Sequence, residues 1–138
     1  MPVTADLLRL VPLFAGMTDR SFEAIATVAA DVSFEEGDDL VRQGEAGTAF
    51  FIIVRGRARV DRDGSTIREL GPGDFLGEIA LIDGSPRTAT VTALEPIAAV
   101  TIKRSDFLDL VERQPVFRLE MLNALTQRIR ATGSAPLG

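Results

Sequence analysis

Residues 49–70, AFFIIVRGRARVDRDGSTIREL, decide the class of fold. The stretch consists of three short segments rich in β-branched and aromatic residues, and the last two partly alternate polar with apolar side chains. Asp63 and Gly64 stand between these two segments, and this dipeptide is typical of the tight turn of a β-hairpin. The sequence therefore predicts antiparallel strands that follow one another directly along the chain.

The same pattern extends on both sides, from about Val32 to about Ile102. Glycines recur through this zone, and segments such as TATVTAL and IAAVTI also have the composition of strands. Many short strands at a spacing of about 8–12 residues are typical of a sandwich, a jelly roll or a closed barrel. We therefore expect a mainly β fold.

Helical patterns flank the β zone. Before it, residues 4–10 suit a short helix, and Thr18 is expected to cap a longer helix whose apolar residues recur at helical spacing. Those apolar residues are Phe22, Ile25, Ala26 and Ala29. After it, Ser105 is expected to cap one helix and Pro115 to open another that runs to about Ala131. We expect one domain, residues 1–132, followed by a linker or tail at 133–138.

The last of these helices has an unusually wide apolar surface. One face carries Phe117, Met121, Ala124 and Leu125. The surface is widened by Val116, Leu119, Leu122 and Ile129. A helix with so wide an apolar arc must be covered on more than one side. The helix either docks on the β zone or uses part of the arc to close a pocket or to contact a partner chain.

Composition excludes several classes of function. The 138 residues contain neither cysteine nor histidine, so disulfides, thiolate metal sites and the commonest general base are excluded. The net charge of −5 disfavours binding of duplex nucleic acid or anionic lipid. No apolar run is long enough to span a membrane, and the first residues lack the basic region of a signal peptide. We expect a cytoplasmic protein that needs a local pocket to bind any anion.

One loop, GEIALIDGSPRTATV at residues 77–91, combines two opposite charges with small neighbours. Gly77 would let a ligand approach the backbone, and the amides of Ile79 and Ala80 would face an anion at the start of a helical turn. The guanidinium of Arg87 suits a phosphate, and the carboxylate of Glu78 suits the hydroxyls of a ribose. The alternative is an ion pair between these two side chains on the surface.

The stretch from Phe75 to Ala89, FLGEIALIDGSPRTA, resembles the phosphate-binding cassette of the cyclic nucleotide-binding domain family. Residues 36–38, 43–45 and 51–56 are similar to the early strands and turns of that family. The resemblance implies an α+β, mainly β fold of the catabolite activator protein type. It is an antiparallel β-roll, or jelly-roll barrel, with N-terminal helices and a C-terminal pair formed by a hinge helix and a lid helix.

The resemblance also implies roles for individual residues. Glu78 would bind the ribose 2′-hydroxyl and Arg87 the cyclic phosphate. The backbone cradle would come from Gly77, Ile79, Ala80 and Ala89. The apolar wall under the base would come from Val60, Ile67, Leu70 and Leu76. The lid would present Leu122, Leu125, Arg128 and Ile129. Thr88 would meet either the amino group of guanine or the phosphate, so both cGMP and cAMP stay open, with cAMP favoured.

We therefore expect a sensory module that binds cAMP, or cGMP, and has neither a catalytic cofactor nor a metal. Its lid helix would control an effector domain or partner protein beyond the C-terminus, and that helix could also form a homodimer. By itself the chain is not expected to read DNA. A degenerate domain that serves only for protein contacts is the alternative. A metal-dependent enzyme of cupin type is disfavoured because its site requires histidines.

Overall fold

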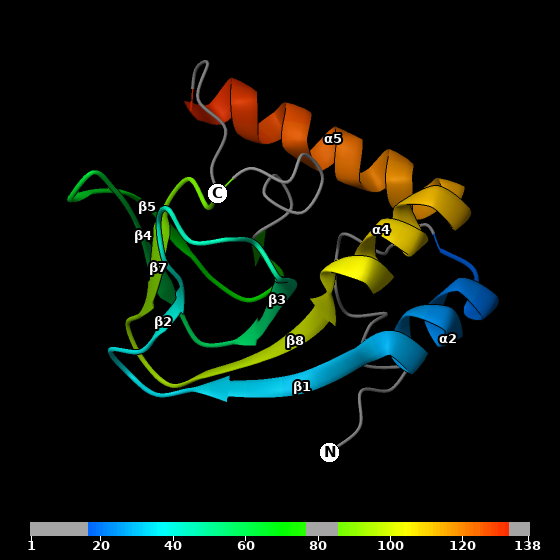
Figure 1. The fold of residues 1–138 in the computed structure, drawn as a ribbon, viewed down its shortest axis with the longest axis horizontal. Coiled ribbons are helices and arrows are strands. Elements are labelled where there is room, and N and C mark those ends of the chain that lie inside the picture. The colour runs from blue at the N-terminus through cyan, green and yellow to red at the C-terminus, as the bar shows by residue number, and fades with distance from the viewer. Residues whose placement is uncertain (1–16, 77–85, 133–138) are drawn as a thin grey trace.

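The computed structural model describes residues 17–76 and 86–132, and at residues 120, 124, 125 and 127–132 it describes the backbone alone. The helix expected at residues 4–10 lies outside this part. None of the helices described is both long and apolar enough to cross a lipid bilayer. Along the chain the elements are α2 (Asp19–Val28), β1 (Ala29–Phe34), β2 (Asp39–Val41), β3 (Ala49–Arg55), β4 (Ala58–Arg62), β5 (Ser65–Leu70), β6 (Phe75–Leu76), β7 (Thr90–Ala93), β8 (Ile97–Lys103), α4 (Arg104–Arg113) and α5 (Pro115–Thr132) (Figure 1).

The strands form two four-stranded antiparallel sheets, in the orders β1-β8-β3-β6 and β2-β7-β4-β5. Both sheets contribute to one hydrophobic cluster, which includes Ile53 and Ile97 from the first sheet and Val60 and Val91 from the second. The two sheets therefore pack face to face as a β-roll. The mainly β fold of the α+β class is confirmed, and in the part described the sheets stay separate instead of closing into one barrel.

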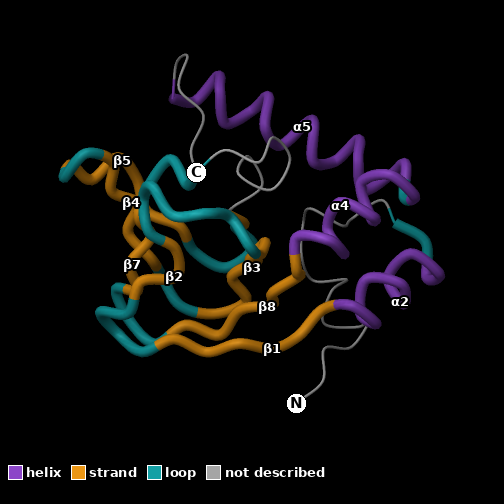
Figure 2. Tube along the Cα trace, viewed as in Figure 1, coloured by secondary structure: helices purple, strands orange, loops and turns teal. Residues whose placement is uncertain are grey.

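The helices cover the other face of the first sheet, so that they gather on one side of the strands (Figure 2). Their cluster joins Phe50 and Ile102 of that sheet to Phe22, Phe107 and Phe117 of the helices. Successive side chains of a strand point to opposite faces. As a result β3 and β8 are buried on both faces, which explains why their sequences read as nearly continuous apolar runs.

Helix α5 is buried on one face and exposed on another. Phe117 is fully buried and Met121 is 2% exposed, so this face docks on the helix side of the domain. The ring of Phe117 meets that of Phe107 edge to face at 5.7 Å. By contrast, Leu119 and Leu122 are 55% and 60% exposed. The wide apolar arc expected from the sequence thus includes an uncovered face in the part that the structure describes.

Local signals at the turns and helix starts are largely confirmed. Asp63 and Gly64 both have positive φ, 52° and 82°, in the turn that joins β4 to β5. Thr18 caps α2 by accepting a hydrogen bond from the amide of Ser21 at 3.2 Å. Pro115 opens α5 as expected. Short-range chemistry therefore identifies these boundaries correctly.

Two of the expected helix ends are wrong. The sequence places Ser105 at the cap of α4, but this helix begins at Arg104 without a side-chain cap. The amide of Arg104 donates to the carbonyl of Thr48 at 3.0 Å, so a distant loop satisfies the first of the amides that lack a partner within the helix. Ala29 was expected on the helical face of α2, yet it opens β1 and pairs with Ile102. In both places tertiary contacts override the local pattern.

Gly56 allows the chain to pass close to β8, and we expect Gly56→Ala to destabilise the domain. Its φ is +97°, and an added Cβ would lie 2.4 Å from the carbonyl oxygen of Pro96. Strain at positive φ together with this collision should lower the free energy of unfolding by about 2–5 kcal/mol in urea denaturation. Gly37→Ala is the matched control, because Gly37 has a φ of +90° but open space around it. Equal losses in both variants would contradict the role of the collision.

Candidate functional site

Arg87 lies in a short segment that leads into β7, and its main chain is held on both sides by the loop between β2 and β3. The amide of Arg87 donates to the carbonyl of Glu45 at 2.8 Å, and its carbonyl accepts from the amide of Gly44 at 2.9 Å. The preceding residue, Pro86, forms an antiparallel bridge with Ala46. These contacts fix the point from which the guanidinium projects.

The side chain of Arg87 is buried, with an exposed fraction of 4%, and it is the only charged residue in that class among those described. Its Nη2 donates to the carbonyl oxygen of Ala49 at 2.6 Å. Burying a guanidinium is costly unless it is paired and hydrogen-bonded. Its planar fork of donors is suited to bidentate pairing with a phosphate. The arginine of the cassette motif is therefore buried in the structure, with its guanidinium held by the carbonyl of Ala49.

The two residues that follow Arg87, Thr88 and Ala89, belong to the same segment. Ala89 is fully buried, and Thr88 is half-buried. The hydroxyl of Thr88 is itself buried, and it has no hydrogen-bond partner among the described residues. A hydroxyl can both donate and accept, and burying one without a partner costs free energy. This group could therefore bond a ligand beside Arg87.

The residues expected under the base are only partly brought together. Val60, Leu70 and Leu76 are all buried and belong to the cluster that also contains Ala89. They come from three different strands, β4, β5 and β6, and meet in this one hydrophobic cluster. Ile67 is 39% exposed on β5 and lies apart from that cluster. Among the four candidates it is the one that the described structure does not unite with the others.

The remaining expected site residues lie mostly outside the described part. This applies to Gly77, Glu78, Ile79 and Ala80 of the cassette. The side chains of Leu125, Arg128 and Ile129 are likewise outside it, although their backbones continue α5. Leu122, the fourth lid candidate, is described and is exposed.

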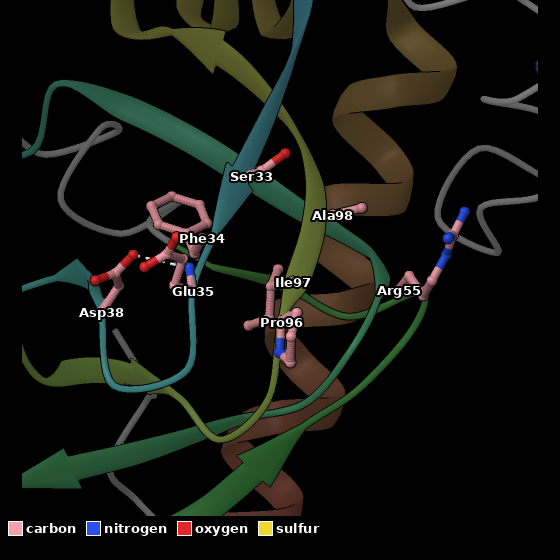
Figure 3. Close-up of a pocket in the computed structure, with 8 residues that line it drawn as sticks. All are labelled: Ser33, Phe34, Glu35, Asp38, Arg55, Pro96, Ile97 and Ala98. Atoms are coloured by element: carbon pink, nitrogen blue, oxygen red, sulfur yellow. Dashed lines mark hydrogen bonds between the residues drawn. The ribbon is translucent and has the colours of Figure 1, made fainter.

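Of two hollows in the described structure that differ in volume, the one that contains Arg87 is the smaller. A cavity of about 590 Å³ lies beside the end of β1 and carries the carboxylates of Glu35 and Asp38 (Figure 3). Arg55 also lines that cavity, but the two carboxylates outnumber its single guanidinium, which disfavours an anionic phosphate there. A smaller hollow of about 90 Å³ is lined by Arg87, Thr48 and Phe51, among others. Its volume is below the roughly 300–1,000 Å³ of most ligand pockets, so it could take only one part of a ligand.

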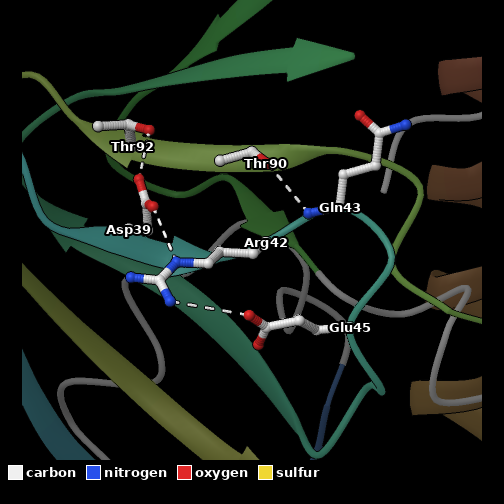
Figure 4. A network of polar contacts seen from close by, with 6 residues as sticks. All are labelled: Asp39, Arg42, Gln43, Glu45, Thr90 and Thr92. Atoms are coloured by element: carbon white, nitrogen blue, oxygen red, sulfur yellow. Dashed lines mark hydrogen bonds and ion pairs between the residues drawn. The ribbon is translucent and has the colours of Figure 1, made fainter. Parts of the chain in front are cut away.

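A polar network on the outer side of the β2–β3 loop was not anticipated from the sequence (Figure 4). Asp39 accepts from the hydroxyl of Thr92 at 2.7 Å and from the guanidinium of Arg42 at 3.0 Å. These two contacts, the hydroxyl first, hold the pKa of Asp39 below its usual range. Arg42 also lies 3.8 Å from the carboxylate of Glu45. The network ties the start of the loop to β7.

The partners of Arg87 were also missed, and they carry little signal in a sequence. Ala49, Gly44 and Glu45 all bind it through main-chain atoms, which any residue type could supply. The Nε of Arg62 reaches the carbonyl of Thr88 at 3.3 Å from the end of β4. Residues 43–45 were noted for their similarity to a family motif, but that similarity did not indicate their contact with Arg87.

Comparison with known proteins decides the family. A profile of the cyclic nucleotide-binding domain matches residues 31–114, which is more than half of the chain. The chain belongs to this family. The cyclic nucleotide-binding domain is 32% identical over 107 residues to a cAMP-dependent protein kinase regulatory subunit of Debaryomyces hansenii, covering 77% of this chain and 24% of that protein. It is 37% identical over 125 residues to a cGMP-dependent protein kinase of Eimeria tenella, covering 88% and 12%.

Among solved structures, the catabolite activator protein of Thermus thermophilus matches this cyclic nucleotide-binding domain with a TM-score of 0.78. The identity is 28%, and the match covers 87% of this chain and 59% of the other. The fold of catabolite activator type implied by the resemblance is confirmed. The chain spans less than two thirds of each of these three proteins, so the similarity concerns one domain of each.

Proposed function

We propose that this domain is a regulatory module that binds a cyclic nucleotide, cAMP in preference to cGMP, and acts by binding without catalysis. The observation that carries this proposal is the burial of Arg87, whose Nη2 is fixed on the carbonyl of Ala49. A cation held in this way suits a compact anionic ligand. The overall charge of −5 would repel such a ligand, so a local clamp is required.

The rest of the cradle follows from the family cassette. Glu78 accepts a hydrogen bond from the ribose 2′-hydroxyl, and the backbone of Gly77, Ile79, Ala80 and Ala89 surrounds the phosphate and ribose. The small residues Gly77, Ala80 and Ala89 let the ligand approach the main chain. Arg87 then pairs with the phosphate, and Glu78 and Arg87 act on different parts of one ligand.

The base rests on an apolar wall. Val60, Leu70 and Leu76 are supported as its members because they share one buried cluster with Ala89. The buried hydroxyl of Thr88 bonds either the phosphate or the amino group of a guanine. Relatives named for cAMP and for cGMP both occur, so the preference for cAMP is a hypothesis for direct measurement.

Helix α5 is proposed to move as a lid and to control an effector domain or partner protein. Its first half is anchored in the core by Phe117 and Met121, while Leu122 is exposed. Leu122, Leu125, Arg128 and Ile129 would contact the base when ligand is bound. A helix anchored at one end can change its contacts at the other without unfolding the core.

A second candidate function is protein contact without a ligand. It is favoured by the apolar side chains of Val116, Leu119 and Leu122, which are 37%, 55% and 60% exposed along α5. Residues three apart lie on the same side of a helix, so these three form a stripe. The same stripe would suit a homodimer through α5. Titration with nucleotides separates this function from the first.

Isothermal titration calorimetry with cAMP and cGMP tests the main proposal directly. We expect Arg87→Ala to weaken binding by about 2–5 kcal/mol, on the order of 30- to several thousand-fold, because it removes the partner of a buried phosphate. Arg87→Lys should also bind poorly, since a point charge does not reproduce the fork of the guanidinium. If Arg87→Ala unfolds the domain but its folded fraction keeps full affinity, Arg87 is only a structural residue.

Glu78→Gln should cost less, about 1–2 kcal/mol of binding free energy, because the amide keeps one acceptor for the ribose. The loss should shrink with a 2′-deoxy cyclic nucleotide, which has no hydroxyl to donate. Calorimetry of the unchanged domain and of Glu78→Gln, each with the cyclic nucleotide and with its 2′-deoxy form, gives the coupling free energy between the carboxylate and the 2′-hydroxyl. A penalty of full size with the deoxy ligand would mean that Glu78 acts elsewhere.

Truncation after Asn123 tests the lid, because it keeps the buried Phe117 and Met121 and removes the rest of α5. We expect the affinity for cAMP to fall by about 1–3 kcal/mol, which is the usual size of such couplings. In the intact chain, hydrogen exchange at residues 118–131 should slow when ligand binds. Unchanged affinity together with equal exchange rates would show that the helix is only a core element.

A further inference from the structure

The loop between β2 and β3 is fixed to the β4–β5 hairpin by one side chain, Gln43. Its Nε2 donates to Oδ1 of Asp63 at 2.8 Å, and its Oε1 accepts from the amide of Asp63 at 3.0 Å. Two parallel hydrogen bonds between the same two residues define orientation as well as distance. The amide of Gln43 also donates to the hydroxyl of Thr90 at 2.9 Å, which ties the same residue to β7 (Figure 4).

The residues directly after Gln43 hold the main chain of Arg87. Gly44 donates to its carbonyl, and Glu45 accepts from its amide. Any rotation of the loop about Gln43 would therefore turn the base of the Arg87 side chain. The hairpin also reaches this segment from its other side, where Nε of Arg62 donates to the carbonyl of Thr88 at 3.3 Å. The β4–β5 hairpin thus contacts the surroundings of Arg87 in two places. Asp63 binds Gln43 of the β2–β3 loop, and Arg62 binds the carbonyl of Thr88.

Gly44 makes that alignment dependent on Gln43. It has a φ of +87°, and an added Cβ would meet no atom within 4 Å, so side-chain packing does not fix its conformation. Glycine is the most freely rotating residue of the backbone. Gln43 and Asp63 are both exposed, where water can replace a lost hydrogen bond and the net loss of stability is small. The contact therefore adds more to the orientation of the loop than to the stability of the core.

We propose that Gln43 is a positioning residue for the phosphate clamp. It aligns the β2–β3 loop with the β4–β5 hairpin through Asp63, and the loop in turn sets the direction of Arg87. Asp63 is suited to this role because its amide, at the tip of the hairpin, donates to Gln43, and aspartate tolerates the φ of 52° found there. The effect on affinity rests on the proposed function of Arg87, whereas the effect on the geometry of Arg87 does not.

Gln43→Ala is the first test, read out by calorimetry with cAMP and by the ¹H–¹⁵N resonance of the Arg87 amide in the ligand-free domain. We expect affinity to fall about 3- to 10-fold, as for the loss of one or two exposed hydrogen bonds, with little change in the midpoint of thermal unfolding. The Arg87 resonance should shift. Thr66→Ala is the matched control, because it removes an exposed hydrogen bond to Asp61 within the same hairpin. It should leave both readouts unchanged.

Exchange of the donor and acceptor gives the second test. Gln43→Glu places two carboxylates in contact and should weaken binding. Gln43→Glu combined with Asp63→Asn re-forms the side-chain hydrogen bond with the donor now on residue 63, and it should restore both readouts. In an Arg87→Lys background, Gln43→Ala should have no further effect on affinity. Unchanged affinity and an unchanged Arg87 resonance in Gln43→Ala, or no rescue by the double variant, would overturn the inference. If the wild-type domain binds neither cyclic nucleotide, the proposed function fails, and the Arg87 resonance alone decides the role of Gln43.

Discussion

Strands β3 and β8 are buried on both faces, and the rest of the structure is arranged around this constraint. One face of each strand packs against the second sheet, and the other packs under α2, α4 and α5. A doubly covered strand cannot shift its register by one residue without exchanging two different sets of neighbours. The register between Phe50 and Ile102 is therefore fixed by both cores at once. The segments that join these strands can then carry polar and charged groups on a rigid support.

The start of β3 shows how this support serves the site. The carbonyl of Ala49 accepts from Arg87, while the ring of the next residue, Phe50, lies 4.8 Å from that of Phe107. Adjacent residues of one strand thus hold the clamp and the helices. Thr48, one residue earlier, accepts from the first amide of α4. The loop between β2 and β3 is consequently the place where the segment that carries Arg87, the first sheet and α4 meet.

Much of this arrangement could be predicted from the sequence, but not all of it. The Asp63–Gly64 turn and the start of α5 at Pro115 were identified correctly because both depend on backbone preferences of the residues themselves. Arg87 was found through a motif of charged and small residues. The acceptor at Ala49 could not be found in this way, because a main-chain carbonyl has no residue signature. The cap expected at Ser105 failed for a related reason, since α4 begins one residue earlier, where the amide of Arg104 donates to the carbonyl of Thr48, a residue far away in sequence.

The ring contact between Phe107 and Phe117 connects the core beside β3 to α5. A close-packed interior passes a displacement on to its neighbours instead of absorbing it. A pull on Ala49 would therefore be felt at Phe50 and, through Phe107, at the anchored half of α5. A continuous series of packed residues does not by itself produce a conformational change on ligand binding. A ligand shifts only an element that has two arrangements with different affinity for it. If α5 moves as proposed, its exposed face is where an arrangement of different affinity could form, since Leu119 and Leu122 would gain contacts when covered while the buried Phe117 and Met121 keep theirs.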